Sequence, residues 1–294
     1  MASTMASTMA QPDFGLFGPG SVTWRVHTEP VLAVAGFFAL AVQSLHPPTM
    51  WGTYQNSSLF DRQQAFARLM RTGDFVAVRT FGSTAEVNEI GRRVRKIHTR
   101  LRGHNPETGE QFRVDEPANL LWVHCGEIIA YLRVAQRAGI LVTDAESDAY
   151  VDEQRRAAAV VGLDPADVPG SVAELDAYFR RMLPELRLTD EARAGFRMWA
   201  NAPVPLWLAP LKVVYPTLAA LAFALLPGWA RGLYGLPPWE FALLDAPATA
   251  ALRALRLAML ATPERLRGGT PVQRRYVNRA LELMRADLPT LAAA

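Results

Sequence analysis

Apolar residues recur at intervals of three and four along most of the chain, which is the spacing of one face of an α-helix. The clearest stripe consists of Val87, Ile90, Val94, Ile97 and Leu101. No segment shows the strict alternation of apolar and polar residues that predicts a half-buried strand, and no internal repeat is present. The pattern therefore predicts an all-α fold.

Prolines, glycines and capping residues predict where the helices begin and end. A buried helix over Val31–Leu45 is expected to stop at His46-Pro47-Pro48, because proline lacks the amide donor and restrains the preceding residue. A helix capped by Asp61 is expected to break at Gly73. Further helix starts are marked by Asp115 with Pro117, Thr143 with Glu146 and Ser171 with Glu174, and later helices are expected near Thr189–Trp199, Pro216–Leu226, Trp239–Met259 and Val272–Arg285.

The spacing of these segments indicates one domain of about ten helices. No linker separates two halves, so residues 18–294 are expected to form a single globular helical domain. Residues 1–17 begin MASTMASTMA, without the basic and apolar regions of a signal peptide, and are expected to be a disordered leader. A polar loop is expected over Gly103–Gly109.

Two apolar stretches are candidates for membrane-spanning helices. Val31–Val42 contains about twelve apolar residues, whereas a spanning helix needs roughly 20. Val204–Trp229 is longer, but four prolines and Lys212 interrupt it. We therefore expect no transmembrane span, while peripheral contact with a membrane stays open.

Composition and charge narrow the class of protein. Half of the 294 residues are hydrophobic and the net charge is +3, which is typical of a globular protein. No dense Lys/Arg block with interleaved aromatic residues is present, so a nucleic-acid partner is not expected. Cys125 is the single cysteine, which excludes an intramolecular disulfide. Together with the lack of a signal peptide, this favours a cytoplasmic location.

The familiar catalytic motifs are missing. The five histidines never occur at the i, i+4 spacing of a helical zinc site, and no calcium-binding loop is present. A nucleophile elbow, a phosphate-binding loop and a glycine-rich dinucleotide motif after a strand are also absent. The usual hydrolase, nucleotidase and dinucleotide-dependent interpretations therefore lose their support.

His98 is the most informative histidine, because it borders the apolar stripe that contains Val94 and Leu101. Arg95 lies one turn before it and Arg102 one turn after it. A neutral imidazole with apolar walls and nearby guanidinium groups suits haem b, whose iron takes a histidine and whose propionates pair with arginines. The alternative is a partly buried histidine bonded to a backbone carbonyl, with the arginines in water.

A second cluster consists of Arg68, Arg71 and Thr72. The two arginines are three residues apart and therefore lie on one side of a helix. They are suited to hydrogen bonding with bound oxygen or peroxide. The alternative is a solvated basic face.

Six blocks occur in an order that resembles one known family. They read GPGSVTW, QSLHPP, ARLMRTGDFVAVRTFG, VRKIHTRLRG, TGEQFRVDEPANLLWVH and VDEQRRAAAVVGLDPADVPGSVAEL. In this order they resemble the rubber-oxygenase/MpaB-type oxygenase catalytic domain family. The resemblance extends from about Gly18 to the C-terminal helices.

The resemblance implies an all-α fold that encloses a haem b pocket. The family's V-R-x-x-H helix supplies the proximal iron ligand, and it matches Val94, Arg95 and His98 here. Its R-x-x-K-T motif supplies distal residues and matches Arg68, Arg71 and Thr72. Arg71 replaces the lysine, and an arginine stays charged, so a resting haem capped by lysine is not expected.

A second departure is the sequence Trp122-Val123-His124, where the rubber-cleaving branch has a different helix. His124 has three interpretations: a further pocket residue that acts as a distal acid or base, the iron ligand in place of His98, or a core histidine behind Trp122. Glu127, one turn later, either orients the His124 ring or lies at the surface.

The resemblance and the residues together predict a haem b-dependent oxidoreductase. It is expected to act on a small apolar organic molecule with O₂ or peroxide, with His98 on the iron and Arg68, Arg71, Thr72 and His124 in catalytic roles. The apolar Val204–Leu226 region is expected to form part of the substrate channel wall. The alternatives are a haem-binding protein without turnover and a membrane-peripheral helical protein. The oligomeric state is left open.

Overall fold

The computed structural model describes residues 12–61, 63–200, 211–264 and 268–291, and these confirm the predicted all-α class. The first helices are α1 (Val22–His27), α2 (Ala33–Gln43), α3 (Pro47–Asn56), α4 (Ala65–Phe81), α5 (Thr84–His98), α6 (Pro117–Ala138) and α7 (Asp144–Val161). The later helices are α8 (Val172–Met182), α9 (Asp190–Ala200), α10 (Leu211–Ala224), α11 (Gly228–Leu233), α12 (Pro238–Ala261) and α13 (Pro271–Leu291). Four single-turn 3₁₀ helices, η1 (Pro30–Leu32), η2 (Ser58–Phe60), η3 (Pro165–Asp167) and η4 (Leu183–Glu185), connect them.

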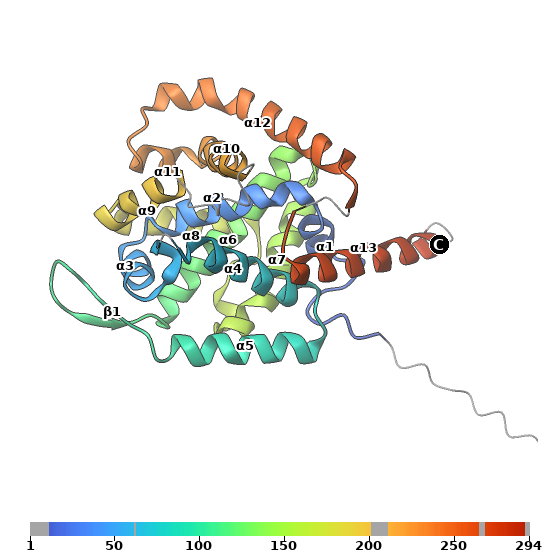
Figure 1. Cartoon of the computed structure of the whole chain (residues 1–294), viewed down its shortest axis with the longest axis horizontal. Helices are drawn as coiled ribbons and strands as arrows, with labels where there is room; N and C mark the ends of the chain where they lie inside the picture. Colours follow the sequence, from blue (N-terminus) through green and yellow to red (C-terminus); the bar gives the residue numbers. More distant parts are fainter. Residues whose placement is uncertain (1–11, 62, 201–210, 265–267, 292–294) are drawn as a thin grey trace, which may run out of the picture.

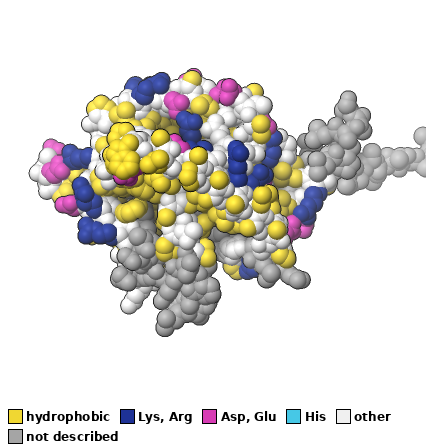
Figure 2. Space-filling view, turned by 90° about the horizontal axis from the view of Figure 1, so that it is seen from above, with side chains coloured by type: hydrophobic (Ala, Val, Ile, Leu, Met, Phe, Trp, Pro, Cys, Tyr) yellow, Lys and Arg dark blue, Asp and Glu magenta, His cyan; other side chains and the backbone are white. Residues whose placement is uncertain are grey.

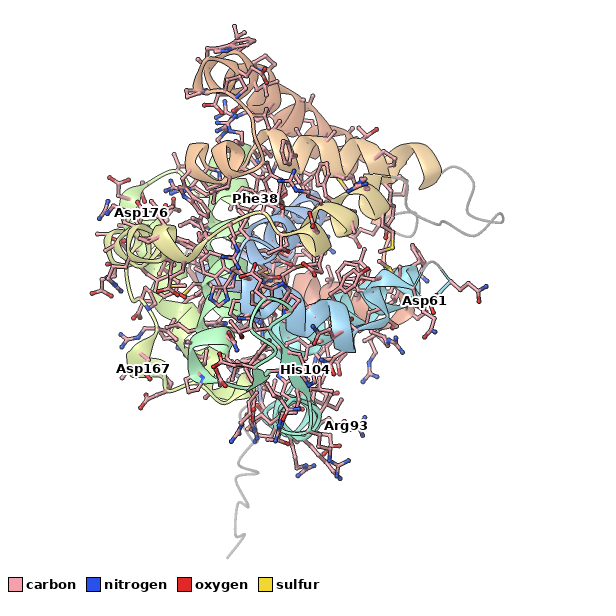
Figure 3. All side chains as sticks on the ribbon, turned by 90° about the vertical axis from the view of Figure 1, so that its left-hand side faces the viewer. Phe38, Asp61, Arg93, His104, Asp167 and Asp176 are labelled. Carbon is pink, nitrogen blue, oxygen red and sulfur yellow. The ribbon has the colours of Figure 1, made fainter. Side chains whose placement is uncertain are left out.

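The centre of the molecule is the packing of α2 against α6 (Figure 1). Gly126 permits this close approach, because a Cβ atom there would lie 2.8 Å from Cγ of Gln43. The indole Nε1 of Trp122 donates a hydrogen bond to the Gln43 carbonyl at 3.0 Å, which fixes the end of α2 against α6. Phe38 lies inside, whereas Arg93 and Asp176 lie at the periphery (Figure 3).

The remaining helices surround this pair. α10 and α12 cover it along one edge of the molecule, with α12 outermost, whereas α5 forms the opposite edge and α13 runs along α4 (Figure 1). The predicted break at Gly73 is wrong, because α4 continues through it. The glycine instead admits α13, since a Cβ atom there would lie 2.4 Å from Nε2 of Gln273.

The loop expected over Gly103–Gly109 is confirmed for residues 105–109, which connect the strands of a small antiparallel hairpin that the sequence pattern did not predict. Strands β1 (Arg102–His104) and β2 (Gln111–Arg113) pair with Gly103 opposite Phe112. A Cβ atom on Gly103 would lie 2.3 Å from the Phe112 ring, so the glycine makes room for an aromatic side chain that covers the strand. Strands of three residues are too short to show an alternating pattern.

Most predicted helix ends are confirmed within a residue or two. The proline pair that ends α2 also begins α3, with Pro47 in the first turn, where a missing amide costs nothing. The capping box of Thr143 and Glu146 forms at the start of α7. At α6 the N-cap is Glu116 instead of Asp115. Asp61 accepts amides two and three residues later, and α4 begins after Gln64.

The predicted boundary of the leader at residue 17 is too late. Asp13 accepts hydrogen bonds from the backbone and hydroxyl of Thr84, and Phe14 makes an edge contact with Trp24, 5.9 Å between ring centroids. Phe17 is buried. Residues 1–11 lie outside the described part of the chain.

No described helix is by itself long and apolar enough to span a membrane. Residues 30–43 and 47–56 together have the length and composition of a span, but they are bent by 110°. The first seven residues of the apolar stretch assigned to the substrate channel, residues 204–210, lie outside the described residues.

Candidate functional site

Two consecutive antiparallel helices bring the first predicted site residues together. A two-residue link, Gly82 and Ser83, joins α4 to α5, and α5 runs back so that the charge of Arg68, in the first turn of α4, acts on its last residue. Ser83 and Glu86 form a capping box that begins α5. His98 is the last residue of α5, and its imidazole lies close enough to the Arg68 guanidinium for that charge to lower its pKa.

The His98 side chain is available as a ligand. Its Nδ1 atom is buried and has no hydrogen-bond partner within the described residues. Burial lowers the pKa of the imidazole, the Asp115 carboxylate acts in the opposite direction, and the Arg68 charge lowers it further. The ring is therefore neutral near pH 7 and keeps a lone pair, which is the form that binds a metal.

Arg68 and Thr72 form a local pair on α4. Nη1 of Arg68 donates to Oγ1 of Thr72 at 2.5 Å, and the Thr72 hydroxyl is 3.3 Å from the Arg68 carbonyl. Burial and the neighbouring Arg71 charge lower the pKa of Arg68. Arg71 is exposed and reaches Oγ of Ser58 at 3.5 Å. Of this motif, Arg68 is the residue whose charge acts on His98, while Thr72 contacts Arg68 and Arg71 extends toward Ser58.

Arg95 lies elsewhere, although one turn of α5 separates it from His98. Its Nη1 atom donates to the carbonyls of Val160 at 2.7 Å and Ala159 at 3.4 Å. Both carbonyls belong to the C-terminal turn of α7; the Ala159 carbonyl also accepts from the Gly162 amide at 3.2 Å, whereas no described backbone amide donates to the Val160 carbonyl. In this structure Arg95 therefore joins α5 to the end of α7.

His124 belongs to a different neighbourhood. It is 4 % exposed, and its Nε2 atom is 3.1 Å from the Gln154 carbonyl, so that nitrogen carries the proton and donates. Burial lowers the pKa of His124 to about 4, against the opposite effect of Glu127. The charged groups that shift the pKa of His124 are different from those that shift the pKa of His98.

Glu127 neither lies free at the surface nor bonds His124; it forms an ion pair with Arg79 of α4. Nη1 and Nη2 of Arg79 donate to the two carboxylate oxygens, at 2.9 and 2.5 Å. Arg79 is 2 % exposed, and its charge overcomes the effect of burial and lowers the pKa of Glu127 to about 2.

Sequence reasoning missed the polar cluster around this ion pair. His27 stacks on Tyr131 at 4.3 Å between ring centroids, and its Nε2 atom is 3.1 Å from the Tyr150 hydroxyl. A signal was present: Arg79 and Glu127 each interrupt an apolar helix face with a charge, and the two charges are opposite in sign. Opposite charges at two core positions predict a buried ion pair.

The buried histidines give a first prediction, for acid stability. His46, which contacts Thr49 through Nδ1 at 2.9 Å, and His124 are each 4 % exposed, and burial lowers both pKa values to about 4. The unfolded chain binds these protons near pH 6.5, so below that pH it holds more protons than the native state. Burial also lowers the pKa of His27, to about 3, so the native state lacks a third proton that the unfolded chain binds. The free energy of unfolding should therefore fall by about 3–4 kcal/mol per pH unit between roughly pH 6 and pH 4.5. Urea unfolding across this range checks the slope, which a constant midpoint would contradict.

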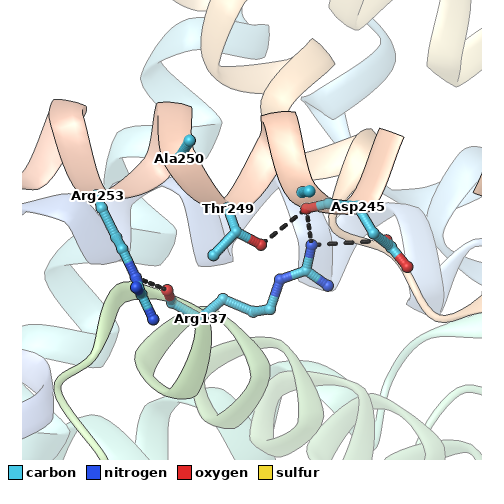
Figure 4. Close-up of a pocket in the computed structure, with 6 residues that line it drawn as sticks. Arg137, Asp245, Thr249, Ala250 and Arg253 are labelled. Atoms are coloured by element: carbon cyan, nitrogen blue, oxygen red, sulfur yellow. Dashed lines mark hydrogen bonds and ion pairs between the residues drawn. The ribbon is translucent and has the colours of Figure 1, made fainter. Parts of the chain in front are cut away.

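A hollow of about 590 Å³ lies between α6 and α12, and it contains none of the predicted site residues (Figure 4). Nη2 of Arg137 donates to the Asp245 carbonyl at 2.7 Å, and Nε of Arg253 donates to the Arg137 carbonyl at 3.1 Å. Thr249 bonds the same Asp245 carbonyl. The polar side chains that line the hollow already form bonds within the chain, so we do not place the candidate functional site there.

No group of three or more histidine, cysteine, aspartate and glutamate side chains in the described ranges is placed to hold a metal ion. Cys125 is buried, and burial raises the pKa of its thiol. A cofactor that needs one protein ligand is therefore easier to reconcile with the described residues than a bare metal ion.

Comparison with known proteins agrees with the resemblance in the sequence. Residues 24–262 match the family described as "ER-bound oxygenase mpaB/B'/Rubber oxygenase, catalytic domain". No curated protein and no solved structure matches the chain. The matched region includes α4, α5 and α6 and therefore every residue of the two neighbourhoods described above. The chain belongs to the family of catalytic domains that includes the ER-bound oxygenase mpaB/B' and rubber oxygenase.

Proposed function

We propose that the protein is a haem b-dependent oxidoreductase of the oxygenase type, with His98 as the iron ligand. The observation that carries the proposal is the neutral, half-buried His98 imidazole, whose Nδ1 atom is buried and without a hydrogen-bond partner within the described residues. A buried polar group without a partner is uncommon and requires an explanation. In an oxygenase catalytic domain, a bound cofactor supplies one.

The residues near His98 fit a haem. Its ring requires apolar walls, and Ile97, next to His98, is 56 % exposed instead of packed into the core. Val94 and Leu101, of the same stripe, are only half-buried. The apolar face of α5 is thus left partly uncovered at the end that carries His98.

The cations near His98 suit the acidic groups of the same cofactor. Arg68 is half-buried and close to His98, and its charge is partly desolvated, which strengthens its attraction for a carboxylate. Arg95, which forms its hydrogen bonds with the end of α7, is not needed for this role. We therefore assign propionate or oxygen-species binding to Arg68, with Arg71 beside it.

The chain's own residues have distinct tasks in this proposal. His98 holds the iron, and the bound haem supplies O₂ or peroxide chemistry that protein side chains lack. The Thr72 hydroxyl accepts from Arg68 and so orients the guanidinium. The apolar surface of α5 excludes water and favours a small apolar organic substrate.

His124 supports the proposal less well. Its Nε2 proton is donated to the Gln154 carbonyl, and a ring in this tautomer cannot bind iron through that atom. It lies beside the Arg79–Glu127 ion pair, whose net charge is zero. We propose a structural role for His124 in the packing of α6 against α7.

Titration of the purified protein with haemin tests the function. We expect a Soret band that differs from that of free haemin and saturates at one equivalent per chain, because the chain offers one unpartnered buried imidazole among the described residues. Arg68→Ala should weaken binding by about tenfold, as expected for the loss of one charge-assisted contact. Arg285→Ala, at an exposed arginine paired with Glu264, is the control. A spectrum that stays that of free haemin would contradict the proposal.

A further inference from the structure

The outward face of α12 carries an exposed row of apolar side chains. Trp239, Leu243 and Leu257 expose 65, 66 and 68 % of their surfaces. In the view from above, hydrophobic side chains extend across the face of the molecule that α12 forms (Figure 2). The exposed positions along the middle of this face are Trp239, Leu243, Ala246, Ala250, Ala254, Leu257 and Ala261.

The opposite side of the same helix already faces the core. Ala248 and Leu252 are buried there against the central helices. A helix that is apolar on both sides is normally covered on both sides, whereas a helix at a solvated edge carries polar residues outward. Monomeric proteins also rarely expose contiguous apolar patches of this kind. The outward face of α12 therefore has the composition of a covered surface.

The spacing of the row is symmetric about Ala250. The intervals are 4, 3, 4, 4, 3 and 4 residues, the spacing of one stripe along a helix, and the side-chain sizes at these positions suit an antiparallel pair. A two-fold axis at Ala250 places Leu243 opposite Leu257 of the second copy, and Trp239 opposite the small Ala261. The three central positions are alanines, which allow two helices to approach closely where they cross. A two-fold interface requires this self-complementarity.

The charges beside the row favour a second copy over a lipid surface. Interfacial helices use free Lys and Arg side chains on their polar flank to contact lipid phosphates. Of the two arginines of α12, Arg256 pairs with Glu29 at 2.5 Å, and Nε of the exposed Arg253 donates to the Arg137 carbonyl at 3.1 Å. One exposed guanidinium beside the row is fewer cations than the basic flank of an interfacial helix carries.

The available area is sufficient for a small interface. A helix of 24 residues is about 36 Å long and roughly 11 Å wide, so its outward half presents ~600 Å². Two such faces give about 1,200 Å², which is the lower end of the range for specific interfaces. The geometry points to a homodimer in which α12 of each copy packs antiparallel against α12 of the other, about a two-fold axis at Ala250.

Sedimentation of the full chain across a concentration series tests the dimer. We expect twice the chain mass of 32.4 kDa at the upper end. Leu243→Glu should raise the dissociation constant at least about 100-fold, because the two-fold axis brings two unpaired carboxylates into the interface. The double variant Leu243→Glu/Leu257→Lys should restore the dimer, since the antiparallel register pairs the new charges. Val142→Glu, at an exposed valine outside the row, should change nothing.

A cross-link tests the register. Ala250→Cys should form a disulfide-linked dimer on oxidation, whereas Ala251→Cys, rotated by about 100° around the helix, should not. Cys125 is fully buried and does not compete. A monomer at every concentration, without a cross-link at position 250, would overturn the proposal. So would binding of the monomer to anionic phospholipid vesicles that Leu243→Glu abolishes, because that result assigns the face to lipid.

Discussion

Replacing His98 by glycine is expected to lower the affinity for haem at least about 100-fold, which corresponds to about 2.7 kcal/mol. The variant removes the one imidazole in the described residues that has a buried ring nitrogen without a hydrogen-bond partner. The fold should tolerate the change, because His98 ends α5 and glycine is well accepted at the end of a helix. Haemin titration, followed by the Soret band, measures the loss.

Added imidazole should restore the Soret band of His98→Gly, because it can occupy the space of the missing ring and bind the iron. His104→Gly is the matched control: this histidine lies six residues later in β1 and is exposed, its imidazole lies 3.4 Å from Gln111, and its bonds to Gln55 are made by the backbone, which the variant keeps. It should bind haemin like the wild-type protein. Unchanged affinity of His98→Gly for haemin would show that His98 is not the iron ligand.

The second large effect is expected at the Arg79–Glu127 ion pair. Glu127→Gln removes the carboxylate charge while it keeps the shape of the side chain, and leaves the Arg79 guanidinium, 2 % exposed, without a counter-charge. Breaking one partner of a buried ion pair typically costs about 3–5 kcal/mol. We expect a loss near the lower end of this range, because the Glu127 side chain is 19 % exposed.

Urea unfolding of three further variants separates burial from charge pairing. Glu107→Gln breaks an exposed pair with Arg187, whose bonds of 2.6 and 2.7 Å are as short, and should cost less than about 1 kcal/mol. The double variant Arg79→Met/Glu127→Leu leaves no charge unpaired. Its loss of unfolding free energy should therefore be smaller than the sum of the losses in Arg79→Met and in Glu127→Gln. Equal losses of unfolding free energy in Glu127→Gln and Glu107→Gln would contradict the claim that burial makes the Arg79–Glu127 pair the more costly one to break.

The sequence predicts local features of the site well. Arg68 and Thr72 are one turn apart, so their contact follows from helix geometry. The closeness of Arg68 to His98 follows from a short link between two antiparallel helices. The all-α class follows from the spacing of apolar residues over many helices, where single errors do not change the outcome.

Contacts between distant segments could not be predicted in the same way. The partner of Arg95 is the end of α7, 64 and 65 residues later, and no local pattern indicates which helix end lies there. The outward face of α12 was missed for another reason. Periodicity detects the contrast between an apolar and a polar side, and this helix has little such contrast.

The most direct test of the central claim compares haem retention by the wild-type protein, His98→Gln and His124→Gln. Each is loaded with one equivalent of haemin, passed through gel filtration and measured for haem per chain. Glutamine at position 124 can still donate to the Gln154 carbonyl, so this variant should fold and retain haem like the wild type. We predict that His98→Gln loses the haem. Retention by His98→Gln together with loss by His124→Gln would contradict the account and place the iron on His124.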